Sequence, residues 1–491
     1  MKSLFSLLAT GALVLLPQRL GAQANATGID WQYRLLEGST LVDDCLICAR
    51  PTILQPMRGS FRLVLIENTP LFSRYALRDV SFLAGSPTNE AYSVVGAGTY
   101  QIGGEVAVLQ DMTLQVVLSD PNNVTTNKEF TNDVRTIDRA WPIIDVHLVQ
   151  TDNNLVHYYS VHLLAAPLRE IWFSTGGGFT ASKWQSPTNR VSPGDLISDS
   201  GRIVCSNSRL LGKLGLTPVV PDLGIDAVDI GPGGKVFFSL NEAVFSETLG
   251  PIQHGDLLSD RGTIFRKNEA LLAAFAPQST GIDYGLDAVQ VMTDSTIYFS
   301  TTTNVITSKG MLFRGDVLSN EGKLIKSNQQ LLARFHPPVV DHDYGLDALY
   351  IWPGGEIWFS TEEGFNDSQL GPILAGDVLS DQGYVVYHNL ELVSAFAPIE
   401  DVADFGLDAL YIVTDTIPPP PIPKISSVIG SSPVGDLSLN WTGSGRVFQL
   451  EKATIATGPF APISPLMVDL NWLDSRATQS YSNGFYRLRQ W

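Results

Sequence analysis

Four aspartates recur at a fixed spacing in the middle of the chain and are the residues best suited to metal chemistry. Each lies two residues after the glycine of a Gly-[Ile/Leu]-Asp-Ala motif, and the set is Asp226, Asp287, Asp347 and Asp408. Ionised carboxylates at ~6 Å repel by roughly 2–3 kcal/mol per pair at an effective dielectric near 20. Ca²⁺ prefers such oxygen ligands. The pattern leaves two interpretations open: a bound calcium ion, or side chains that turn away to accept backbone hydrogen bonds.

Two other sets of repeated acids are predicted to be structural. The first follows glycine at the start of a strand, where a carboxylate satisfies backbone donors, and consists of Asp195, Asp256, Asp316 and Asp377. The second lies in tight hairpins and consists of Asp199, Asp260, Asn320 and Asp381. Because the second set accepts asparagine, it is typical of turn chemistry.

A fourfold sequence repeat must position these acids. In the copy that begins at Gly345, the pattern predicts strands over 346–351, 356–360, 377–380 and 384–387, then a short helix with Asn389 as its N-cap. Repeated four-stranded meanders are typical of β-propeller blades. The last motif-bearing segment, 406–412, has no further blade to follow it. We therefore expect it to complete the first blade and close a ring, with an open stack of repeats as the alternative.

The repeated Asp-Ala pair, followed by a turn and an aromatic-rich strand, resembles the hemopexin-like four-bladed propeller. The matching pairs start at Asp226, Asp287, Asp347 and Asp408, and the resemblance implies that they line a central channel that holds calcium. This repeat is longer than that of the family, and its third strand carries Gly-Asp-x-Leu-Ser. The resemblance covers about half of the chain and is one of architecture, so it does not carry over the family's ligands.

The long loops of each repeat are expected to form the binding surface. In a meander these variable loops share one face, and functional residues usually lie on such loops. Phe179 and Trp184 lie in the longest of them, and Glu362 and Phe365 in the last. We expect these residues to contact a protein or a glycan at the cell surface.

The N-terminus predicts export. Lys2 precedes an apolar run from Leu4 to Leu16, and Ala22-Gln23-Ala24 is a small-x-small cleavage site. Residues 1–24 are therefore read as a signal peptide, and no second run is long enough to span a bilayer. We expect a secreted or surface-associated bacterial protein.

Two of the three cysteines are close in sequence, at Cys45 and Cys48. A zinc site would need two more ligands, which the early histidines do not supply at a suitable spacing. For an exported chain a local disulfide is favoured, while free thiols, zinc and redox chemistry stay open. Cys205 is expected to be buried.

The predicted fold class is all-β. The expected domains are a β-sandwich or barrel over 25–165, the propeller over 166–417, a Pro-rich linker over 418–423 and a small β-sandwich over 424–491. The last of these ends in Gly-Phe-Tyr-Arg-Leu-Arg and resembles a C-terminal module of many exported bacterial proteins. The first domain and the repeats resemble a family of exported bacterial proteins.

Composition and motifs narrow the function. A formal charge of −18 argues against nucleic-acid binding, which needs a basic face. The chain has no G-x-S-x-G, H-E-x-x-H or Walker A motif, so no catalytic residue is assigned. The favoured function is a non-catalytic binding or adhesion protein. The alternatives are a polysaccharide hydrolase with carboxylates on the long-loop face and a structural component of the envelope.

Overall fold

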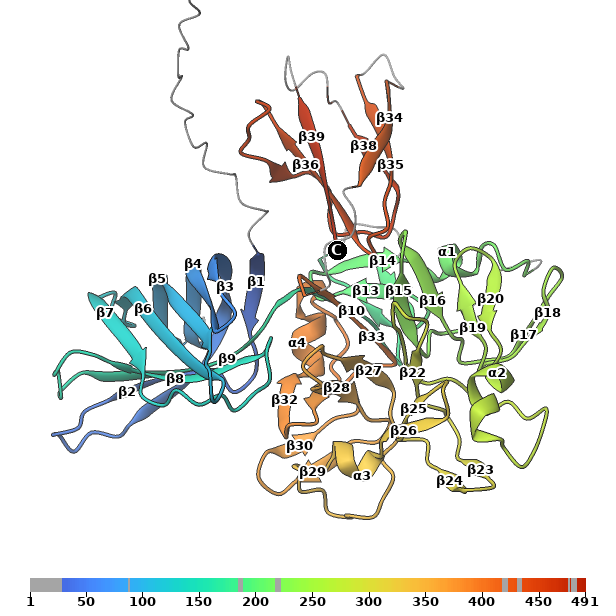
Figure 1. Ribbon diagram of the computed structural model, residues 1–491, viewed down its shortest axis with the longest axis horizontal. Helices are drawn as coiled ribbons and strands as arrows, with labels where there is room; N and C mark the ends of the chain where they lie inside the picture. Colours follow the sequence, from blue (N-terminus) through green and yellow to red (C-terminus); the bar gives the residue numbers. More distant parts are fainter. Residues whose placement is uncertain are drawn as a thin grey trace, which may run out of the picture.

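The computed structural model describes residues 29–86, 89–183, 189–216, 222–416, 423–430, 435–475, 477 and 484–491. Their regular secondary structure is almost entirely β-strand, which confirms the predicted fold class. Figure 1 shows a barrel (blue), a ring of sheets (green to orange) and a small module above the ring (red). No helix in the described ranges is long and apolar enough to cross a membrane. The predicted signal peptide and most of the predicted linker lie outside them.

The N-terminal part is a closed antiparallel barrel. Its strands are β1 (Asp30–Leu35), β2 (Thr40–Asp44), β3 (Ile53–Asn68), β4 (Phe72–Ser86), β5 (Asn89–Gly103), β6 (Leu109–Ser119), β7 (Thr125–Asn132), β8 (Ile144–Gln150) and β9 (Tyr158–Ala166). Strands β3 to β9 pair in sequence order, and β1 and β2 each pair with both β3 and β9. Of the two predicted architectures, the structure is therefore the barrel.

Glycines set the path of the barrel strands. A Cβ at Gly98 in β5 would lie 2.0 Å from the carbonyl oxygen of Thr113 in β6, so only glycine permits this close approach. The segment 104–109 is mostly the connection from β5 to β6. Gly103 and Gly104 have φ values of 143° and 155°, which turn the chain out of the sheet.

The middle of the chain forms four four-stranded sheets. Their strands are β33 (Ala409–Thr414), β10 (Leu168–Ser174), β13 (Leu196–Ser198) and β14 (Arg202–Cys205); β15 (Val228–Gly231), β16 (Lys235–Phe238), β19 (Leu257–Ser259) and β20 (Thr263–Arg266); β21 (Val289–Val291), β22 (Ile297–Phe299), β25 (Val317–Ser319) and β26 (Lys323–Lys326); β27 (Ala348–Ile351), β28 (Ile357–Ser360), β31 (Val378–Ser380) and β32 (Tyr384–Tyr387). We call these sheets blades 1 to 4, in that order. Each first-named strand is the inner strand of its blade.

The blades form a closed, propeller-like ring. Strand β33 pairs with β10, with Trp172 opposite Tyr411, so the end of the repeat region completes blade 1 as expected. The inner strands β15, β21, β27 and β33 contact one another in a cycle. A serine at the end of each second strand donates a hydrogen bond to a backbone carbonyl of the next blade. These bonds are Ser174 to Ile225 (3.1 Å), Ser239 to Leu286 (2.8 Å), Ser300 to Leu346 (3.1 Å) and Ser360 to Leu407 (3.0 Å).

Short hairpins follow the second strand of each blade, and a short helix follows the fourth strand. Each long loop after the second strand carries a hairpin that the sequence did not predict: β11 (Phe179–Thr180) with β12 (Arg190–Val191), β17 (Val244–Ser246) with β18 (Gly250–Ile252), β23 (Val305–Thr307) with β24 (Gly310–Leu312), and β29 (Phe365–Asp367) with β30 (Gly371–Ile373). The helices are α1 (Asn207–Leu211), α2 (Asn268–Leu272), α3 (Asn328–Leu331) and α4 (Asn389–Val393), with 3₁₀ turns η1 (Ala273–Phe275) and η2 (Ser394–Phe396).

The predicted N-cap role of Asn389 was wrong. His388 is the N-cap, and Asn389 is the first residue of α4. The buried Asn389 side chain donates to the carbonyl of Gly406 (2.9 Å) and accepts from the amide of Phe405 (2.9 Å). It therefore ties the helix to the chain that enters the next inner strand.

The C-terminal module is a sandwich of two three-stranded sheets. Its strands are β34 (Lys424–Gly430), β35 (Leu437–Thr442) and β38 (Asn471–Asp474), and β37 (Ala461–Pro462), β36 (Phe448–Ala453) and β39 (Phe485–Gln490). An ion pair between Arg209 and Asp469 (2.7 Å) and the largely buried side chain of Arg446, which pairs with Asp229, join the module to the ring. The barrel meets blade 4, where the Arg139 guanidinium lies 4.6 Å from the ring centroid of Tyr384.

Candidate functional site

Three sets of repeated acids in the ring are occupied by backbone donors. At the start of the third strand, Asp256 accepts from the amides of Asn268 (3.1 Å) and Gln253 (3.1 Å). The same pair of bonds recurs at Asp195, Asp316 and Asp377. These acids are therefore turn caps, which is the structural role that the sequence predicted.

The hairpin set has one shared acceptor. An oxygen of Asp199, Asp260, Asn320 and Asp381 accepts from the backbone amide of the second strand in its own blade, at 2.9–3.2 Å. Because asparagine also offers this oxygen, Asn320 replaces aspartate without loss of the bond. A third set, before the inner strands, bonds to the amide of a motif glycine and consists of Asp222, Asp283, Asp343 and Asp404.

The fourth set is different. Asp226, Asp287, Asp347 and Asp408 enter the four inner strands from the long-loop face and lie close enough to act on one another electrostatically. Asp287 is only 4% exposed, and within the described part of the chain its Oδ2 faces no donor other than the neighbouring carboxyl group of Glu362. We call these four residues the axial aspartates. They are repeated acids for which backbone donors do not account.

Burial and mutual repulsion disfavour the ionised form of the axial aspartates. Burial, followed by the charges of Asp408 and Glu362, raises the pKa of Asp347 to about 9. Burial raises the pKa of Asp408 to about 6. For Asp226 and Asp287, burial and the neighbouring carboxylates hold the pKa well above the ordinary value. The site is short of positive charge at neutral pH.

Glu362 joins the axial aspartates from the loop that follows β28. One oxygen each from Asp287, Asp347 and Glu362 lie within 4.8 Å of one another. Glu362 also forms an ion pair with Arg314, and its Oε1 is buried without a hydrogen-bond partner in the described structure. The sequence predicts Glu362 on the binding face. Its approach to Asp287 and Asp347 lies outside the repeated motif, so spacing gave no sign of it.

The residues fit a hard divalent cation. The donors are all carboxylate oxygens, which Ca²⁺ prefers, and they come from separate elements of a rigid ring. The Oδ2 of Asp287 is an acceptor that a cation would satisfy. The alternative interpretation of the axial aspartates is that their side chains accept backbone hydrogen bonds. Such bonds describe the other three sets of repeated acids instead.

The aromatic residues predicted to bind a ligand are placed differently. Phe179 is fully buried and packs against Phe396 and Phe405, with ring centroids 5.4 and 5.1 Å away. Phe365 is also buried and lies 5.0 Å from the ring of Tyr344. Both are core residues beneath the long loops and present no exposed surface. Trp184 lies outside the described residues.

Two hollows lie on the long-loop face near blade 4. The larger, of about 540 Å³, is lined by the loop after α3, which includes His336, Val340 and His342, and by Asn366 of β29. A smaller one, of about 180 Å³, lies on the other side of His342 beside Met311. His342 pairs with Glu363 (2.8 Å), which also contacts Arg314. A chain of charges thus runs from this surface to Glu362.

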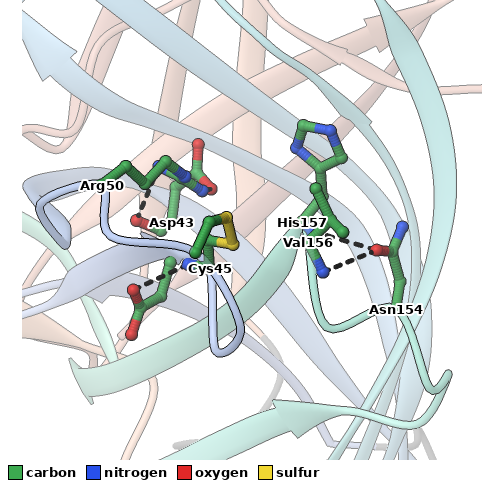
Figure 2. Close-up of a disulfide and its surroundings, with 8 residues drawn as sticks. Asp43, Cys45, Arg50, Asn154, Val156 and His157 are labelled. Carbon is green, nitrogen blue, oxygen red and sulfur yellow. Dashed lines mark hydrogen bonds and ion pairs between the residues drawn. A yellow bond between two sulfur atoms is a disulfide. The ribbon is translucent and has the colours of Figure 1, made fainter.

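The structure pairs Cys45 with Cys48, with Cα atoms 5.4 Å apart, which agrees with the favoured reading. Figure 2 shows the disulfide beside the Asp43–Arg50 ion pair and a turn in which Asn154 accepts from the amides of Val156 and His157. Cys205 is buried, as expected.

Comparisons with known proteins do not define a family. No protein-family model matches the chain, and no curated protein matches it. Two solved structures that are similar both show an extracellular domain from B. thetaiotaomicron, assigned to a one-component system in one case and to a hybrid two-component system in the other. The first has 8% identity and a TM-score of 0.16, covering 91% of this chain and 94% of the other. The second has 10% identity and a TM-score of 0.19, covering 88% and 74%. TM-scores this far below 0.5 support no argument about fold or function.

Proposed function

We propose that the protein is an exported, non-catalytic binding protein. Its ring carries a calcium ion at the axial aspartates and binds a protein or glycan through the long-loop face. The observation that carries the proposal is the contrast among the repeated acids: three sets are occupied by backbone donors, and the axial set is not. The predicted signal peptide and the Cys45–Cys48 disulfide support export, because disulfides persist in oxidising compartments.

Asp287, Asp347 and Glu362 would hold the ion, with Asp226 and Asp408 beside them. A bound calcium ion supplies positive charge that offsets the repulsion among these carboxylates. Arg314 forms ion pairs with both Glu362 and Glu363. Binding of the calcium ion would therefore affect Glu362 and Arg314, which connect through Glu363 to His342 on the loop surface.

The larger hollow on the long-loop face supports a partner there. Val340 at its edge is 75% exposed and Val339 is 56% exposed, so an apolar edge borders the two histidines. Apolar and imidazole groups that meet in a hollow suit a protein or glycan surface. Functional residues commonly lie on such loops when a rigid scaffold supports them.

A binding screen tests the proposal. The secreted form of the full chain is applied to an array of bacterial and host glycans and of purified surface proteins, with 2 mM calcium or with a chelator. We expect calcium-dependent binding that Val340→Glu abolishes. The matched control is Val106→Glu, at a residue of the barrel that is 98% exposed. Binding that is unchanged both by Val340→Glu and by the chelator would overturn the proposal. Release of reducing ends from any glycan would favour the alternative function of a polysaccharide hydrolase.

A further inference from the structure

The other end of the inner strands carries a different set of residues. Three positions after each axial aspartate, the repeat has four residues of three kinds: Asp229, Gln290, Tyr350 and Tyr411. All four side chains are buried. Asp229 accepts from the amide of Val291 in blade 3 (2.7 Å), and Gln290 accepts from the amide of Ile351 in blade 4 (2.8 Å). The fourfold identity of the axial end is therefore absent here.

Arg446 of the C-terminal module enters this end of the ring. Its guanidinium donates to the carbonyls of Ile230 (2.7 Å) and Val291 (2.9 Å) and lies 3.4 Å from Asp229 Oδ2. Arg446 and Asp229 therefore compensate each other's charge. The module and the ring build this end together.

A cavity of about 400 Å³ remains beside this pair, which is the size of a small-molecule site. All four of the diverged repeat residues line it, together with Arg446 and the aromatic residues Tyr298 and Trp352. Trp352 is 1% exposed, and its Nε1–H has no hydrogen-bond partner in the part of the chain that the structure describes. Its ring is fixed edge-on between Tyr350 and Trp358, with centroids 5.1 and 4.9 Å away.

These features select the kind of ligand. A cation would meet Arg446 and an anion would meet Asp229, so net charge is disfavoured in either sign. The aromatic walls suit a ring with apolar faces, while the hydroxyl groups of the lining residues Tyr298, Tyr350 and Tyr411 suit the hydroxyls of such a ring.

We propose that this cavity, shared by the ring and the C-terminal module, binds one neutral sugar unit of a glycan. The site lies at the end of the ring opposite the axial aspartates, so it goes beyond the proposed function and needs no calcium. The four repeats contribute different residues to this cavity, which suits a ligand without fourfold symmetry. A central ion, by contrast, suits the four identical axial aspartates.

Saturation-transfer NMR on the full secreted chain tests this proposal. The probes are glucose, galactose, mannose and the two common N-acetylhexosamines at 10 mM, with glucuronate and glucosamine as charged counterparts. We expect transfer to at least one neutral sugar, weaker transfer to both charged probes, and no change when a chelator is added. Persistence in the chelator separates this site from the calcium-dependent loop face.

Two variants locate the signal. Trp352→Phe replaces the indole with a smaller ring and shortens the aromatic wall of the cavity, so it should raise the dissociation constant roughly three- to tenfold. Tyr298→Ala, at a half-buried residue of the cavity wall, should weaken binding as well. Val106→Glu on the barrel is the control. Absence of transfer from every neutral sugar, or transfer that both cavity variants leave unchanged, would overturn the proposal.

Discussion

The two ends of the ring axis are built from the same four strands but follow opposite rules. At the long-loop end, the repeat keeps four aspartates, and burial raises their pKa values although Arg314 lies nearby in an ion pair with Glu362. At the other end, the equivalent positions have diverged, and Arg446 from outside the ring supplies the charge that Asp229 needs. The difference teaches that a residue kept in all four repeats can mark a site at which the four blades contact one small ion together. A position that differs between the repeats marks contacts that each blade makes for itself.

The largest expected effect comes from removing the charge at the arginine end. Arg446→Ala leaves Asp229 buried without its ion-pair partner, which should lower the free energy of unfolding by about 3–5 kcal/mol. Urea unfolding at pH 7.5 measures the loss. Adding Asp229→Asn to Arg446→Ala should recover much of it, because no uncompensated charge is then left. An equal loss of unfolding free energy in the single and double variants would show that the unpaired charge of Asp229 does not cause the destabilisation.

At the axial end, removing charge should have the opposite sign. Without calcium, Asp287→Asn with Asp347→Asn should raise the thermal midpoint at pH 8, because two carboxyl groups with raised pKa values no longer have to take up a proton from solution when the chain folds. With calcium at 100 times its dissociation constant, the unmodified protein should gain about 2.7 kcal/mol and the double variant should gain nothing. The comparison fails if the double variant is destabilised in chelator.

The same carboxyl groups predict a pH dependence in chelator. Asp347 has a folded pKa of about 9, so between about pH 4 and pH 9 the folded state holds a proton that the unfolded state releases. Stability should therefore fall as the pH rises through this window. Calcium should flatten the upper part of the curve. Thermal unfolding from pH 5 to pH 9 in chelator provides the measurement, and a rise in stability with pH would contradict the assignment.

The smallest effect concerns the serines that join neighbouring blades next to the axial aspartates. Ser239→Ala removes the donor to the Leu286 carbonyl and leaves that acceptor buried, which should cost about 1–2 kcal/mol in urea unfolding. Ser300→Ala should cost a similar amount, since its bond to Leu346 is equivalent. The exposed Ser208→Ala serves as the control. A loss in one blade only would show that the blade interfaces are not equivalent.

Sequence periodicity predicted the ring well because the repeated residues make local, repeated contacts. The hairpin acids, the glycines and the closure of β33 on β10 all follow from the motif. The N-terminal barrel was harder to read. Strands β4 and β5 are 15 residues each, and β5 carries Gly96 and Gly98 where β6 approaches closely, whereas glycine ordinarily counts against a strand.

The candidate site could be predicted only in part. The axial aspartates share a spacing, so their meeting was foreseeable. Glu362 and Arg314 come from loops outside the repeated motif, and Arg446 comes from another module, so no period links them to the axis. Phe179 and Phe365 looked like loop aromatics, but the unforeseen hairpins β11–β12 and β29–β30 fold them into the core.

Isothermal titration calorimetry tests the central claim most directly. Calcium chloride is titrated into the full secreted chain after chelator treatment and dialysis at pH 7.5, beside Asp287→Asn with Asp347→Asn. The account predicts one saturable site in the unmodified protein and none in the double variant, while Arg446→Ala keeps the site if the ring stays folded. Absence of heat in the unmodified protein, or an equal affinity in the double variant, would contradict a cation at the axial aspartates.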